Sequence, residues 1–194
     1  SHYKNDEETG LIVKTSSGRA TTKDKEKTRK AFIKIMKSIG KDKESFPKVY
    51  LLQGEFTPLE MYSLYTHQKT KCYLSLTRGE GYGLPLLEAA RCGLPVLATN
   101  WSGHLDFLKN KFTKIDFDLQ NIPEKRVDNS IFVQNTKWAE VKESSVYKSF
   151  EDVSCNYEKS LQLSDSLKSE IKKDFSKENI VKLYDNLLTS LSFY

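Results

Sequence analysis

The sequence predicts an α/β fold, a parallel sheet with helices packed on its faces, and two observations support this prediction. Between residues 11 and 99, β-branched or apolar runs of strand length alternate with amphipathic segments of helix length. The junctions carry the caps, prolines and glycines that begin and end helices. Strands separated by helices are typical of a parallel sheet that is covered on both faces.

The first two strands and the helices after them have clear boundaries. LIVKT (11–15) is the first expected strand, and the helix after it begins at 21–24, where Thr and Asp have the spacing of a capping box. KVYLLQ (48–53) is the second strand. The next helix begins at TPLE (57–60), which combines a capping threonine, a proline at the first helical position and a glutamate that can reach back to the cap.

Two further strands and one helix complete the predicted sheet. CYLSL (72–76) is the third strand, LPLLEAARC (84–92) is a helix stopped by a glycine, and LPVLAT (94–99) is the fourth strand. The pattern then weakens, with short strands expected near Ile115 and Ile131. No other element is predicted between residues 113 and 135.

The C-terminal third of the chain is predicted to be helical. A Ser176 cap precedes an apolar stripe at helical spacing, which we interpret as core packing; its members are Ile180, Leu183, Leu187 and Leu191. The helix at 147–153 is expected to pack in the same way.

Length and composition indicate a single globular domain over residues 11–194. The chain has 194 residues, of which 38% are hydrophobic and 29% charged. Residues 1–10 are expected to be a disordered leader or a vector-derived remnant. No run is long enough for a membrane span and the start lacks a signal-peptide layout, so a cytoplasmic location is predicted. The chain has three cysteines, Cys72, Cys92 and Cys155, and their spacing does not fit a disulfide framework or a zinc site. We interpret them as buried thiols in a reducing compartment.

The formal net charge of +5 is concentrated in one segment. Residues 19–48 hold eleven Lys/Arg and four Asp/Glu, together with an apolar series at helical spacing. Such a segment is typical of an amphipathic helix with a solvated lysine face. A basic RNA-binding protein is the alternative, but aromatic residues do not alternate with the lysines as a base-stacking surface requires, and no nucleic-acid partner is expected.

The turn between the third strand and its helix is the candidate ligand site. Ligands of open parallel sheets bind beyond the carboxyl ends of the strands. The turn is TRGEGYG (77–83), in which three alternating glycines allow backbone N–H groups to converge on an anion at a helix N-terminus. This pattern favours a phosphate, and a tight connection with no ligand is the alternative.

Two carboxylates distinguish this turn from other glycine loops. Glu80 lies in the turn and Glu88 in the helix, with seven residues between them. Glu88 stands in an apolar context, where an unpaired buried carboxylate would be destabilising, so a polar partner is expected. A sugar diol is one such partner, and a salt bridge to Arg78 or Arg91 is the alternative.

Other phosphate and metal motifs do not fit. A dinucleotide fingerprint needs glycine at position 84, where the chain has Leu84, and no P-loop is present. Asp116 and Asp118 form a D-x-D, but the abundance of aspartate makes one such pair expected by chance, so we interpret it as solvated loop.

These residues carry a resemblance. GEGYGLPLLEAARCGLPVLAT (79–99) resembles the E-x7-E signature of family-4 retaining glycosyltransferases, and WSGHLDFL (101–108) and KWAEV (137–141) are similar to a subgroup of them. The resemblance implies the C-terminal, Rossmann-like half of a GT-B enzyme, which binds a nucleoside-diphosphate sugar and transfers a hexose. It also implies that no metal or other cofactor is required. His104 departs from the asparagine expected at its position, and a structural role is favoured for it.

The resemblance assigns roles to individual residues. Glu80 would be the catalytic residue that holds hydroxyls of the donor sugar, and Glu88 would bind the ribose. The remaining donor-binding residues would face the sugar, the diphosphate or the base; they are Lys14, Arg19, Gly54, Glu55, Arg78, Gly81, Tyr82, Gly83 and Leu84.

The resemblance also indicates missing parts. The acceptor-binding N-terminal domain and the first strand-helix unit of the donor domain find no counterpart, so the chain is expected to be a fragment with little or no transfer activity alone. Strand exchange between copies, giving a homo-oligomer, could restore the sheet. The acceptor, whether glycan, lipid or protein, is not specified. A non-catalytic sugar-nucleotide-binding or interaction module of the same fold is the alternative function.

Overall fold

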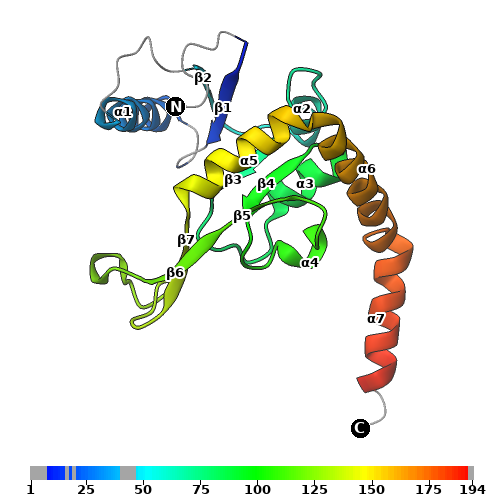
Figure 1. Cartoon of the computed structure of the whole chain (residues 1–194). Helices are drawn as coiled ribbons and strands as arrows, with labels where there is room; N and C mark the ends of the chain where they lie inside the picture. The colour runs from blue at the N-terminus through cyan, green and yellow to red at the C-terminus, as the bar shows by residue number, and fades with distance from the viewer. Residues whose placement is uncertain (1–7, 16–17, 19–20, 40–46, 192–194) are drawn as a thin grey trace. The chain divides into compact units, whose positions relative to one another are not determined.

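The computed structural model describes residues 8–15, 18, 21–39 and 47–191 (Figure 1). Contacts divide the chain into two compact units, Ser1–Met61 and Tyr62–Tyr194. Of the leader expected at 1–10, residues 1–7 lie outside the described part, and Gly10 is already the first residue of a strand. The single domain expected over residues 11–194 stays a prediction.

The first unit contains one strand-helix-strand segment. Strands β1 (Gly10–Thr15) and β2 (Lys48–Gln53) pair in parallel, with Leu11 opposite Val49, and α1 (Thr22–Ser38) connects them. The capping box predicted at the start of α1 is present, because the Thr21 hydroxyl accepts from the Asp24 amide and the Asp24 carboxylate accepts from the Thr21 amide. No residue of α1 is buried within the described part of the chain, so its apolar series is not enclosed any more than its lysines are.

Helix α2 (Pro58–Tyr65) begins where its sequence predicts. The Thr57 amide donates to Glu60 Oε2 at 2.7 Å, and the Glu60 amide donates to Thr57 Oγ1 at 3.3 Å. These reciprocal bonds satisfy two of the N–H groups that a helix start leaves unpaired.

The second unit is built on a three-stranded parallel sheet in the order β3-β4-β5 (Figure 1). The strands are β3 (Tyr73–Ser75), β4 (Val96–Thr99) and β5 (Thr113–Ile115), and the connecting helices are α3 (Leu84–Cys92) and α4 (Leu105–Leu108). All four residues of β4 are buried. Because successive side chains of a strand point to opposite faces, both faces of this sheet are covered.

Two layers of helix cover the central strand. Leu97 of β4 packs with Ile115 and with Val153 of α5 (Glu143–Cys155) in one apolar cluster. Helix α3 contacts β3 and β4 with a buried face of Leu86, Ala89 and Ala90. Helix α6 (Tyr157–Asp174) packs against both α3 and α5. The predicted α/β fold is confirmed.

A two-stranded antiparallel hairpin, absent from the prediction, follows β5. It consists of β6 (Phe117–Asn121) and β7 (Lys137–Val141), and a short 3-10 turn at Glu124–Arg126 lies in its long loop. The strand expected near Ile115 is confirmed, but the one near Ile131 is wrong. Ile131 is 79% exposed in a turn whose amides donate to the Asp128 carboxylate.

The C-terminal helices are present, but the expected packing of the last one is wrong. Helix α7 (Lys177–Leu191) begins at the predicted cap, where the Asn179 amide donates to Ser176 Oγ at 3.2 Å. None of its residues is buried, and Leu187 is 54% exposed. Its apolar stripe is therefore uncovered from Leu183 onward within the described part of the chain, whereas Ile180 is partly buried. Among the described helices, none is long and apolar enough to span a bilayer.

The cysteines differ in exposure. Cys72 and Cys92 are partly buried, as expected, and burial raises the pKa of the Cys72 thiol to about 11. Cys155 is exposed at the end of α5, so its interpretation as a buried thiol is wrong.

Truncation of Leu97 tests the position of the core. Leu97→Ala should lower the free energy of unfolding by about 2–5 kcal/mol, because the side chain is fully buried between sheet and helix. The matched change Leu187→Ala should lower it by less than about 0.5 kcal/mol. Urea unfolding measures both, and an equal loss would contradict an uncovered α7.

Candidate functional site

The glycine turn connects the end of β3 to the start of α3. Gly83 is the N-cap of α3 in the left-handed conformation, with φ 89°, and a Cβ there would lie 3.1 Å from both His104 Cβ and Leu86 Cδ1. Gly83 therefore meets both a conformational and a steric requirement. A Cβ on Gly81 would meet nothing within 4 Å, so protein packing does not account for glycine there. The side of the Gly81 Cα that would carry a side chain borders open space.

A second loop, from β4 to α4, holds the turn in place. Ser102 Oγ accepts a hydrogen bond from the Glu80 amide at 2.8 Å and donates one to the Glu80 carbonyl at 2.6 Å. The Gly103 amide donates to the same carbonyl at 3.2 Å. A Cβ on Gly103 would overlap the carbonyl group of Gly81, so the two loops approach as closely as a glycine permits.

At the tip of the turn three consecutive backbone donors have no acceptor among the described residues; Gly81 and Tyr82 are exposed, whereas Gly83 is buried. Among the described residues, the amides of Gly81, Tyr82 and Gly83 donate to no protein acceptor. They precede α3, whose N-terminus carries partial positive charge and which has no side-chain cap hydrogen bond. This arrangement can bind an anion through backbone N–H groups.

Both carboxylates of the motif act on one region of the site. Burial raises the pKa of Tyr73, and the negative charges of Glu80 and Glu88 raise it further. Glu88 also contributes to the raised pKa of Tyr65, for which burial is again the main cause. Glu80 and Glu88 therefore lie within Coulombic reach of the same phenol.

The expectation that Glu88 is buried is wrong. On the short helix α3, Leu86, Ala89 and Ala90 form the buried face, and Glu88 lies on the exposed side. Within the described part of the chain it forms no hydrogen bond or ion pair, and the alternative salt bridge to Arg78 or Arg91 is not formed. Glu88 is thus available to a ligand.

Arg78 is held by residues of the hairpin. Its Nε donates to Glu140 Oε2 at 2.7 Å and its Nη2 donates to Glu140 Oε1 at 3.0 Å. Its guanidinium lies 4.4 Å from the ring centroid of Trp138, and the Ala139 amide donates to its carbonyl. Strand β7 thereby fixes the second residue of the glycine turn, and the side-chain pair remains about half exposed.

Of the donor-binding residues predicted in the first unit, Lys14, Gly54 and Glu55 lie at the carboxyl ends of the paired strands β1 and β2. Lys14 is near the carboxyl end of β1, with its Nζ 5.5 Å from the Phe56 ring centroid. Gly54, buried and at φ 112°, directly follows β2, and Glu55 is exposed beside it. Arg19 lies outside the described residues.

His104 stabilises the loop after β4. Its side chain is fully buried, its Nε2 lies 2.7 Å from the Thr99 carbonyl oxygen, and its ring contacts Phe112 edge-on. Thr99 in turn donates from Oγ1 to the Thr77 carbonyl. These contacts support the structural role favoured for His104.

The D-x-D motif does not form a metal site in the described part of the chain. Asp118 lies in β6 rather than in a loop, which corrects the interpretation from sequence, and its carboxylate pairs with Lys142 Nζ at 3.0 Å. No group of three potential metal ligands is found among the described residues.

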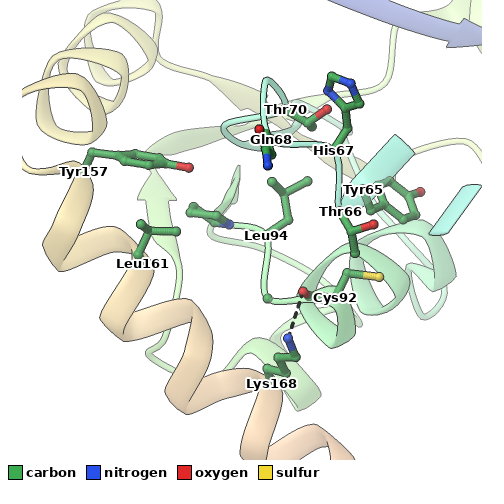
Figure 2. Close-up of a pocket in the computed structure, with 12 residues that line it drawn as sticks. Tyr65, Thr66, His67, Gln68, Thr70, Cys92, Leu94, Tyr157, Leu161 and Lys168 are labelled. Carbon is green, nitrogen blue, oxygen red and sulfur yellow. Dashed lines mark hydrogen bonds between the residues drawn. The ribbon is translucent and has the colours of Figure 1, made fainter. Parts of the chain in front are cut away.

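A hollow of about 320 Å³ lies at the other end of α3 (Figure 2). Cys92 and Leu94 line it together with Tyr157 and Lys168 of α6, and Lys168 Nζ donates to the Cys92 carbonyl at 3.2 Å. None of the predicted site residues lines it. The glycine turn is therefore a separate feature of the second unit.

Sequence reasoning missed the residues that position the turn. Ser102, Gly103, Trp138 and Glu140 each contact it from a distant part of the chain. The S-G dipeptide at 102–103 signals a turn, but nothing local indicates which segment that turn contacts.

The fold and the turn define an α/β domain with a glycine turn at the carboxyl end of a parallel strand, which is where open parallel sheets bind their ligands. Residues 47–124 match the family model described as glycosyl transferases group 1. This segment, less than half of the chain, contains the glycine turn, both carboxylates and the loop of Ser102. No curated protein matches the chain. The family match supports a GT-B glycosyltransferase, and parallel sheets flanked by helices are consistent with its Rossmann-like domain.

Two glycine substitutions test the contact between the loops. Gly103→Ala should lower the free energy of unfolding by about 1–3 kcal/mol, because the new methyl group overlaps the Gly81 carbonyl. Gly81→Ala should change it by less than about 1 kcal/mol, because its Cβ meets only open space. Thermal or urea unfolding compares them, and a harmless Gly103→Ala would show that the loops do not touch.

Proposed function

We propose that the chain is the donor-binding domain of a family-4 retaining glycosyltransferase that transfers a hexose from a nucleoside-diphosphate sugar to an acceptor. One observation carries the proposal. Three unpaired backbone amides precede α3, and Glu80 and Glu88 lie on either side of them within the segment that matches group 1 glycosyltransferases. This arrangement offers donors for a phosphate and acceptors for sugar hydroxyls.

In this proposal the turn binds the charged part of the donor. The amides of Gly81, Tyr82 and Gly83, with the N-terminal dipole of α3, stabilise the negative charge that develops on the departing diphosphate. Arg78 adds positive charge, because the pair with Glu140 uses two of the five guanidinium N–H groups and leaves others for an anion. The reaction then requires no metal.

The carboxylates bind the neutral parts of the donor. A carboxylate accepts two hydrogen bonds from a vicinal diol, and each charged bond contributes about 1.5–3 kcal/mol. Glu80 orients hydroxyls of the transferred sugar, and Glu88 binds the ribose. Lys14, Arg19, Gly54 and Glu55 supply further contacts to the diphosphate and base. We further propose that an N-terminal domain binds the acceptor, whose identity is not specified, and that the enzyme acts in the cytoplasm.

Removal of the Glu88 carboxylate tests the ribose assignment. Glu88→Ala should weaken binding of the nucleotide sugar about 10- to 100-fold, which corresponds to the loss of about 1.5–3 kcal/mol. A thermal-shift panel of UDP- and GDP-sugars first identifies the donor, and calorimetry then measures its dissociation constant.

Asp152→Ala, which removes an exposed carboxylate of α5, is the matched control and should leave the dissociation constant unchanged. Equal affinities of Glu88→Ala and the control would contradict the ribose assignment. Donor binding with no transfer, once the chain is joined to its acceptor domain, would favour a non-catalytic module.

A further inference from the structure

Ser102 has a strained backbone at the point where the two loops meet. Its φ is 92°, a conformation that L side chains rarely adopt and that glycine adopts without strain. A glycine at this position would therefore relieve the backbone. Strain of this kind persists only where surrounding contacts hold the residue in place.

Two contacts hold Ser102: the Leu105 amide donates to its carbonyl, and its own hydroxyl bonds the Glu80 backbone. The hydroxyl accepts from the Glu80 amide and donates to the Glu80 carbonyl, so it fixes both ends of one residue. The carbonyl has a second donor, the Gly103 amide. The Glu80 amide has only the Ser102 hydroxyl among the described residues.

The orientation of Glu80 determines what the turn presents. With its amide and carbonyl both bonded to the β4 loop, the peptide planes on either side of Glu80 have little freedom to rotate. The next amides, those of Gly81, Tyr82 and Gly83, are the ones left without a protein acceptor. A looser Glu80 would allow its carboxylate and these amides to adopt several orientations, which weakens binding through lost preorganisation.

We infer that Ser102 is a positioning residue, whose hydroxyl orients the Glu80 carboxylate and the amides after it toward the sugar donor. This inference rests on the proposed function. In this role Ser102 does not itself contact the donor. The positioning role explains why position 102 holds a serine although its backbone conformation favours glycine.

The variant Ser102→Gly separates a positioning role from a structural one. It removes the hydroxyl and at the same time relieves the backbone, so the melting temperature should shift by less than about 4 °C. The Glu80 amide should exchange with deuterium at least about 10-fold faster, and the dissociation constant for the nucleotide sugar should rise about 10-fold. Ser102→Ala, which removes the hydroxyl but keeps the strained Cβ, should show the same faster exchange together with a lower melting temperature.

The outcomes distinguish this inference from the proposed function. Unchanged exchange of the Glu80 amide in Ser102→Gly would overturn the inference without any ligand. Faster exchange with unchanged affinity, in a wild-type chain that binds UDP- or GDP-sugars, would overturn the positioning role alone. A wild-type chain that binds none of these sugars would overturn the proposed function and, with it, the role of Ser102 toward a donor.

Discussion

The candidate site depends on the close contact between the glycine turn and the loop after β4. Gly103 lies against the Gly81 carbonyl, where no side chain would fit, and the adjacent Ser102 and Gly103 bond the backbone of Glu80. Because these contacts hold the turn by its backbone, the residues at its tip do not have to be held in place by side-chain packing. The amides before α3 can therefore remain unpaired while the turn stays ordered. A binding site made of backbone groups requires an ordered turn of this kind.

Local signals in the sequence predicted the helix and strand boundaries up to residue 99. The capping boxes at Thr21 and Thr57 and the glycine stop at Gly93 are all confirmed, because cap interactions act within one turn of helix. The burial of β4 on both faces was also predictable, since a continuous apolar run between two helices has few other solutions.

Contacts between distant segments were not predictable from local signals. Arg78 and Glu140 pair across 62 positions, and the hairpin that supplies Glu140 is closed by a long loop rather than by a two-residue turn that the sequence would reveal. For α7 the helical period predicted which face is apolar, but not whether another segment covers it. Glu88 stands among apolar residues, yet its angular position on α3 places it away from the buried face. Adjacent residues in a helix point in different directions, so the apolar neighbours of Glu88 in the sequence do not indicate that Glu88 itself is buried.

The central claim is that the unpaired amides of the glycine turn bind the diphosphate of a sugar donor. Titration of the ¹⁵N-labelled chain with UDP- and GDP-sugars, followed by two-dimensional NMR, tests this most directly. We predict saturable shifts of the Gly81, Tyr82 and Gly83 amides. Shifts confined to the hollow around Tyr157 and Lys168, or no shifts at all, would contradict it.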